Sequence, residues 1–247
     1  MKKNEKWKKL AEAFSGRGAS PVPEKYPEVP FAEMIRVLAS LSEADWGMYA
    51  FSREPLEGRF TAEQKRKYTV EANSCGREWA KKMTAQYGTK SPYSLAKKMG
   101  LKVETPKVPA GGELVLFAQF VQPDEITIFT DCVDKAVALR EGGAPGLFER
   151  EKLMNVLLAH ELFHAVEERY SEEIYTHTEK VELWKKPFSN RSRIACLSEI
   201  AAMAFAAELN GLTYSPYMLD VLLVYSYDKN AAWGLYDEIL SLREMNQ

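Results

Sequence analysis

Two histidines and a glutamate lie close together in residues 159–166, AHELFHAV. His160 and His164 are four positions apart, so on a helix both imidazoles face the same side and can bind one metal ion. Glu161 points about a quarter turn away, where it can reach a metal-bound water but cannot easily bind the ion. This is the HExxH pattern, in which zinc takes the two histidines and the glutamate acts as general base. The chemistry that it predicts is zinc-dependent hydrolysis.

The composition favours a metal site over two packed core histidines. The chain has only three histidines, and the motif uses two of them together with the required glutamate. Leu153, Val156 and Leu157 share a helical stripe with His160 and His164, which predicts that the histidines lie on the buried side of the helix. The alternative is a helical scaffold without metal, in which both histidines are hydrogen-bonded core residues.

A catalytic zinc site also needs a third protein ligand and an open position for water. The HExxHxxGxxH pattern is excluded, because Glu167 and Tyr170 stand where it has a glycine and a third histidine. Glu199 is the best candidate, since it lies on a predicted helix rich in alanine, and small side chains let two helices approach closely. The alternative third ligands are Glu208, Glu182, Cys196 and, in a polar run, His177.

The elements that position these residues are mostly helical. Apolar periodicity and start and stop signals predict helices over residues 31–50, 60–87, 147–170, 192–210 and 230–245. A short helix in SPYSLAKKMG begins after Ser91 and stops at Gly100, and another, DCVDKAVALREGG, ends at Gly142 and Gly143. The aromatic run 213–227 fits either the lining of a groove or a buried helix.

The strands are predicted between residues 101 and 130. LKVET, ELVLFAQFV and EITIFT are rich in β-branched or aromatic residues and are separated by proline and glycine. The order of helices, a small sheet and then helices predicts a mainly helical α+β fold. Residues 1–30 are predicted to be a basic N-terminal segment followed by a Pro/Gly-rich linker or wrapped loop, and residues 31–247 a single domain.

Charge and cysteine usage exclude several classes of protein. The formal net charge of -2 gives no general attraction to nucleic acid. The three cysteines are far apart and form no disulfide framework, which suits a reducing cytoplasm. No segment approaches the ~18 consecutive apolar residues of a membrane span. We therefore expect a cytoplasmic protein that binds neither nucleic acid nor membrane.

Four segments carry a resemblance to a known family: SPYSLAKKMGLKVE, EITIFT, LLAHELFHAV and EIAAMAFAAEL. Over about residues 75–212 the chain resembles the ImmA/IrrE-type zinc metallopeptidases. The resemblance implies a zincin-like metallopeptidase core of helices on a small sheet, with His160, His164 and Glu199 as zinc ligands and Glu161 as base. Known members act in the bacterial cytoplasm on regulatory proteins, often DNA-binding repressors, so the implied partner is a protein or peptide substrate such as a transcriptional regulator.

The chain also departs from the family. Phe163 stands where the family usually has glycine, and NGL follows FAAEL in place of the usual apolar residues and proline. Glu199 follows His164 by 35 positions, a gap that includes the charged stretch 167–186. Residues 1–70 hold no helix-turn-helix signature. The zinc site therefore transfers to this chain better than a repressor substrate does.

Peptide hydrolysis makes two further demands. The oxyanion needs a donor besides zinc, and the candidates are Tyr170, Tyr175 and His177, which follow the metal helix. A substrate strand can pair with the edge of the sheet, which we expect along residues 125–130 if that strand has a free edge. The competing prediction is a regulatory protein that binds zinc and a partner on the same fold but cleaves nothing.

Overall fold

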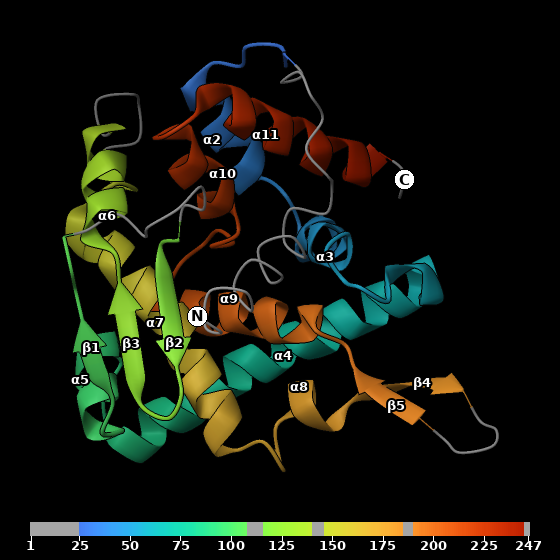
Figure 1. The fold of residues 1–247 in the computed structure, drawn as a ribbon, viewed down its shortest axis with the longest axis vertical. Helices are drawn as coiled ribbons and strands as arrows, with labels where there is room; N and C mark the ends of the chain where they lie inside the picture. The colour runs from blue at the N-terminus through green and yellow to red at the C-terminus, as the bar shows by residue number, and fades with distance from the viewer. Residues whose placement is uncertain (1–24, 108–115, 140–145, 185–189, 245–247) are drawn as a thin grey trace, which may run out of the picture.

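The computed structural model describes residues 25–107, 116–139, 146–184 and 190–244. Most of these residues are helical and a small mixed sheet accompanies them, so the α+β prediction is confirmed (Figure 1). The helices are α2 (Phe31–Ala39), α3 (Glu43–Phe51), α4 (Ala62–Tyr87), α5 (Pro92–Lys98), α6 (Thr130–Val137), α7 (Arg150–Arg169), α8 (Tyr175–Thr178), α9 (Cys196–Asn210), α10 (Met218–Tyr225) and α11 (Lys229–Glu244), with a 3-10 turn, η1 (Glu57–Arg59). The strands are β1 (Lys102–Glu104), β2 (Ala118–Val121), β3 (Glu125–Ile128), β4 (Lys180–Trp184) and β5 (Asn190–Arg193).

The three-stranded sheet has the order β1-β3-β2, with β3 parallel to β1 and antiparallel to β2. Both edges of β3 are therefore paired, and the expectation that a substrate pairs along residues 125–130 is wrong. The physical reason is burial: Ile126 and Ile128 are fully buried, which favours the central position for their strand. Among the described strands, the outer edge of β2 has no partner.

Local capping signals decide where the first helices begin and end. The predicted helix over residues 31–50 is two helices, because Ser42 and Asp45 form a capping box that starts α3 anew. The next helix, α4, agrees with the prediction and starts after Thr61. The short helix α5 also begins as predicted, with the Ser91 hydroxyl accepting from a backbone N–H, and Gly100 after it has a φ of 78°.

Helix α7, which carries the HExxH motif, is buried on most of its surface. Leu158, Leu162 and Phe163 are fully buried, whereas the side chains of His160 and His164 are 16% and 20% exposed. The histidines are therefore largely buried, as their stripe predicts, but they are less completely covered than their neighbours on α7. The reason is that α7 packs against the sheet, α5, α6 and α9, so its other faces are covered. An open side is what a metal that receives a substrate requires.

Helix α9 packs closely against both α7 and α4. Against α7, the ring centroids of Phe205 and Phe163 are 5.6 Å apart, so these two phenylalanines fill the interface. Against α4, a Cβ built on Gly76 would lie 2.1 Å from the carbonyl oxygen of Ala201. The alanines of α9 permit a close approach to another helix, as the sequence predicts. The residue that they approach in this way is Gly76 of α4. Glu199 is positioned by both contacts.

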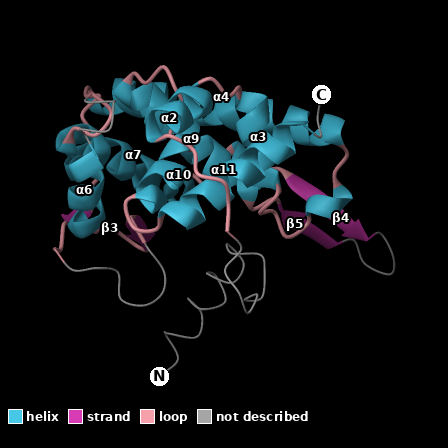
Figure 2. Ribbon diagram, turned by 90° about the horizontal axis from the view of Figure 1, so that it is seen from above, coloured by secondary structure: helices cyan, strands magenta, loops and turns pink. Residues whose placement is uncertain are grey.

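The charged stretch after α7 contains structure that the sequence analysis does not predict. It folds into α8 and an antiparallel β4–β5 hairpin, and because residues 190–193 form a strand, α9 begins at Cys196 and not at residue 192. The hairpin and the three-stranded sheet lie at opposite ends of the helical layer (Figures 1 and 2). No helix in the described part of the chain is long and apolar enough to cross a membrane.

The described part of the predicted linker, residues 25–30, is a loop wrapped on α11. The backbone N–H of Tyr26 donates to Asn230, and the indole N–H of Trp233 donates to the carbonyl of Val29. Some predicted features lie outside the described residues. They are the basic segment before this loop, the glycines predicted to end the helix after residue 131, and the first part of ELVLFAQFV. The run 213–227 contributes the buried helix α10, as one of its two interpretations predicts.

Candidate metal centre

Three side chains from α7 and α9 converge on one point. One ligand atom each from His160, His164 and Glu199 lies within 4.8 Å of the other two. The two histidine Nε2 atoms are 3.2 Å apart, and the Glu199 carboxylate oxygens lie 3.3 Å from Nε2 of His160 and 3.6 Å from Nε2 of His164. Two imidazole nitrogens and a carboxylate that face one another form a donor set suited to a divalent metal ion. It is the one group of this kind among the described residues.

The opposite charges in this cluster stabilise one another: the histidines favour the ionised form of Glu199, and the carboxylates favour the protonated form of His164. Partial burial raises the pKa of Glu199, but its hydrogen bond to His160 and the charges of His164 and His160 outweigh that effect and lower the pKa to about 2. Burial lowers the pKa of His164, but a hydrogen bond to Glu167 and the charges of Glu199 and Glu161 raise it to about 9. A cation is therefore favoured at this position, and a bound metal displaces the proton of the imidazole.

Glu161 lies beside the cluster but faces the sheet. It is 7% exposed, and its carboxylate accepts a hydrogen bond from the backbone N–H of Phe120 in β2. Burial raises the pKa of Glu161, the charges of His160 and His164 lower it, and the net shift is upward. A carboxyl group with a raised pKa, held next to a metal position without binding the metal, has the properties of a general base.

A second set of contacts surrounds the other nitrogen of His164. Ser198, which precedes Glu199 on α9, donates its hydroxyl to Oε2 of Glu167 over 2.6 Å and lies 3.3 Å from Nδ1 of His164. Oε2 of Glu167 is also 3.5 Å from that nitrogen. In the sequence, Glu167 stands out only because it replaces the glycine of the HExxHxxGxxH pattern, and nothing singles out Ser198. Their distance of 31 positions along the chain leaves no local signal that joins them.

The three predicted oxyanion donors have other partners. The hydroxyl of Tyr170 lies 3.3 Å from the amide of Gln86, and the hydroxyl of Tyr175 donates to Glu71, so both are held against α4. His177 is not an exposed residue: its side chain is 10% exposed, and its Nε2 lies 3.0 Å from Arg193 and 3.7 Å from Oε1 of Glu167. None of the three belongs to the metal-ligand cluster.

The alternative third ligands also lie elsewhere. Glu208 lines a separate cavity, and Glu182 lies in β4, where it pairs in register with Arg191. Cys196 is buried at the start of α9 beside Glu54, and its burial together with the charge of Glu54 raises the pKa of the thiol. A protonated thiol is a poor metal ligand. Glu199 is therefore the third member of the cluster.

Two residues of the run 213–227 reach the same region. The buried hydroxyl of Tyr217 has no hydrogen-bond partner among the described residues, and burial followed by the charge of Glu199 raises its pKa. Asp220 accepts a hydrogen bond from Tyr49, and burial raises its pKa to about 6, against the opposing charge of His160. The aromatic composition of this run is a signal for packing, and it does not distinguish a tyrosine beside a metal position from a core tyrosine.

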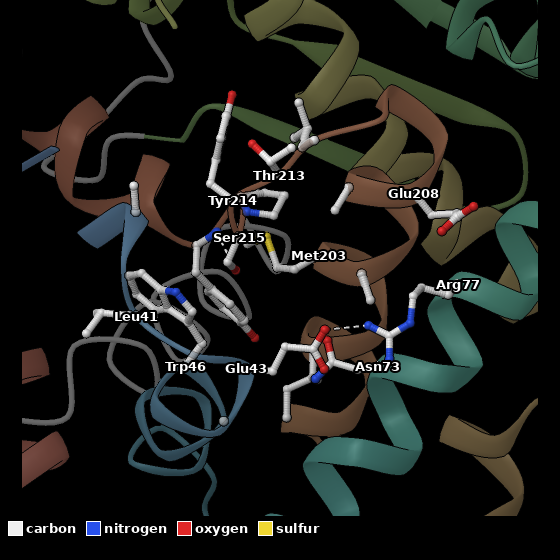
Figure 3. Close-up of a pocket in the computed structure, with 18 of the residues that line it drawn as sticks. Leu41, Glu43, Trp46, Asn73, Arg77, Met203, Glu208, Thr213, Tyr214 and Ser215 are labelled. Carbon is white, nitrogen blue, oxygen red and sulfur yellow. Dashed lines mark hydrogen bonds and ion pairs between the residues drawn. The ribbon is translucent and has the colours of Figure 1, made fainter. Parts of the chain in front are cut away.

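A cavity of about 460 Å³ lies between α3, α4, α9 and the loop before α10 (Figure 3). Its wall includes Trp46 and Met203, and an ion pair between Glu43 and Arg77 crosses it (Figure 3). None of the three cluster residues lines this cavity. The metal cluster and this cavity are therefore distinct features of the molecule.

No protein-family model matches this chain, and comparisons with curated proteins and with solved structures returned no significant match.

Proposed function

We propose that this protein is a zinc-dependent metallopeptidase with a zincin-like core, of the ImmA/IrrE type that its sequence resembles. The observation that carries the proposal is the convergence of His160, His164 and Glu199, with Glu161 beside them on the metal helix. This is the HExxH arrangement with a glutamate from a second helix as third ligand. In line with the resemblance, we propose a regulatory protein as substrate and the bacterial cytoplasm as the location.

The donor set fits zinc. His160 and His164 offer one nitrogen each and Glu199 a carboxylate, which is the His₂Glu set of catalytic zinc sites and leaves a fourth position open. When bound there, zinc supplies Lewis-acid activation of a water molecule and of the substrate carbonyl. The partial exposure of all three side chains leaves room for both.

Glu161 is the proposed general base. Its carboxylate takes the proton of the attacking water and later gives it to the leaving amine. The raised pKa suits this role, because a base titrating closer to neutral pH both accepts and returns a proton efficiently. The hydrogen bond from the N–H of Phe120 holds the carboxylate in place.

The outer edge of β2 is the proposed docking position for the substrate backbone. The carbonyl of Phe117 accepts from the N–H of Phe129, so in the antiparallel register the backbone groups of Phe117, Gln119 and Val121 point toward β3. Those of Ala118 and Phe120 point outward, and the N–H of Phe120 reaches Glu161. A peptide strand added at this edge lies next to the base and the metal ligands.

Substrate binding at this edge is expected to slow hydrogen exchange of the Ala118 backbone amide. The measurement uses a Glu161→Gln variant, in which we expect cleavage to be slow enough for the peptide to stay intact, with and without a saturating peptide. The amide of Thr127 in the central strand serves as the internal control, because both edges of β3 are already paired. Unchanged exchange at Ala118 in the presence of bound peptide excludes this edge.

Zinc content tests the proposed function most directly. Purified wild-type protein is expected to hold about one zinc per chain by elemental mass spectrometry. A Glu199→Ala variant is expected to lose most of that zinc after dialysis, because two imidazoles alone remain. Glu208→Ala removes a glutamate from the same helix without touching the cluster and should retain zinc. Wild-type protein that binds no zinc even after zinc is added refutes the proposal.

A further inference from the structure

We propose that Glu167, held by Ser198, positions His164 and fixes which of its nitrogens faces the metal. The inference deepens the proposed function and rests on it. Glu167 lies on α7 three positions after His164, and its side chain is only 8% exposed. It contacts Nδ1 of His164, the nitrogen opposite the one in the metal cluster. Glu167 is thus a positioning residue, since it touches neither the metal position nor the substrate.

The hydrogen-bond geometry assigns the protons. Ser198 has a single hydroxyl proton, and it donates that proton to Oε2 of Glu167 over 2.6 Å. The contact of 3.3 Å between the Ser198 oxygen and Nδ1 of His164 then requires Nδ1 to be the donor. With its proton on Nδ1, His164 presents the lone pair of Nε2 to the cluster, which is the form that binds a metal.

The burial of Glu167 points to the same role. A buried carboxylate is costly unless a cation or several hydrogen bonds offset it. Oε1 of Glu167 has no hydrogen bond among the described residues. Its nearest basic group there, Nε2 of His177 at 3.7 Å, faces the guanidinium of Arg193 at 3.0 Å and therefore accepts a hydrogen bond from that donor. The negative charge of Glu167 is thus compensated chiefly by His164. A metal ion bound at Nε2 of His164 would add positive charge on the far side of the ring and strengthen that compensation.

The segment between the two metal helices encloses this carboxylate. His177 comes from α8 and Arg193 from β5, both in the segment that joins His164 to Glu199. The contacts of His177 are with Arg193 and Glu167, and its role as an oxyanion donor stays a prediction. The segment made of α8, β4 and β5 thus covers Glu167, the residue that supports the proposed ligand His164.

The two histidine ligands differ in their support. Nδ1 of His160 is buried and has no hydrogen-bond partner among the described residues. His164 has two neighbours at the equivalent atom, Ser198 and Glu167. The structure therefore assigns His164 as the ligand whose orientation is fixed before metal binds, and predicts that its support contributes measurably to metal affinity.

The test measures zinc affinity by competition with a chromophoric chelator at one fixed pH. Glu167→Gln keeps the shape of the side chain and removes its charge, and we expect zinc to bind about 10–100-fold more weakly. Ser198→Ala should weaken binding in the same direction. Glu168→Gln, which changes the adjacent exposed residue, should leave the affinity unchanged. Unfolding of the zinc-free proteins is measured in parallel, because a purely structural role lowers the melting temperature without a specific effect on zinc.

Cobalt(II) absorption adds a signature of ligand orientation, since the visible bands should shift in Glu167→Gln and not in Glu168→Gln. Wild-type zinc affinity in both Glu167→Gln and Ser198→Ala overturns the inference and leaves the proposed zinc site intact. If Glu167→Gln does not fold, Ser198→Ala decides alone. Wild-type protein without zinc overturns the proposed function and this inference together.

Discussion

A Glu161→Gln variant is expected to bind zinc as the wild type does and to hydrolyse peptides about 10²–10⁴-fold more slowly. Glutamine has the same shape as glutamate, and its amide oxygen still accepts the hydrogen bond from the N–H of Phe120. It cannot take a proton from water at neutral pH. The variant therefore loses hydrolytic activity but keeps zinc, because His160, His164 and Glu199 remain in place. The measurement compares cleavage of a peptide mixture by mass spectrometry, with zinc content determined on the same samples.

Glu168→Gln is the matched control, because it makes the same chemical change on an exposed position of the same helix. It should cleave at the wild-type rate. The experiment also separates the two classes of protein that the sequence leaves open. A regulatory protein that binds zinc and a partner without cleaving has no use for the base, so its biological effect should survive Glu161→Gln unchanged. That outcome, with zinc still bound, contradicts the peptidase proposal.

The part of the site that the sequence predicts is the part that depends on local geometry. The spacing of His160 and His164 determines their shared face on any helix, so four positions are enough to bring the two nitrogens within 3.2 Å. Glu199 is a longer-range prediction, and the structure does bring its carboxylate to the two histidines, although the close approach of the alanine-rich helix is to α4 and not to the helix that carries them. The start of α5 after Ser91 is predicted for the same local reason, because a serine at that position accepts a hydrogen bond from a backbone N–H of the first turn.

The features that the sequence does not predict depend on contacts between distant segments. The histidines keep a partial exposure because other elements cover the remaining faces of α7, and the periodicity of one helix cannot reveal this. Glu167 and Ser198 meet across two helices, and β4 pairs with β5 in a stretch whose composition indicates only charge. Helix α4 shows the same limit, since Gly76 looks like a mild helix breaker until α9 is packed against it.

A Gly76→Ala variant is expected to destabilise the protein by about 3 kcal/mol or more and to weaken zinc binding. In an isolated helix alanine is favoured over glycine by about 1 kcal/mol, so the substitution would normally stabilise α4. Here the added Cβ lies 2.1 Å from the carbonyl oxygen of Ala201, which is backbone and cannot rotate away. Helices α4 and α9 must separate, and that cost exceeds the gain in helix propensity. The measurement is urea-induced unfolding of the zinc-free protein.

The effect on zinc follows from the position of Glu199. The separation moves α9, and with it the carboxylate that lies 3.3 Å from Nε2 of His160. Zinc affinity should therefore fall in Gly76→Ala although no ligand is changed. Gly58→Ala is the control, since a Cβ there meets no atom within 4 Å, and it should leave both stability and zinc affinity close to wild type. A Gly76→Ala protein as stable as the wild type would show that α4 and α9 are not in close contact. Weakened zinc binding in Gly76→Ala, with wild-type binding in Gly58→Ala, would establish that helix packing remote from the ligands holds the third ligand of the site.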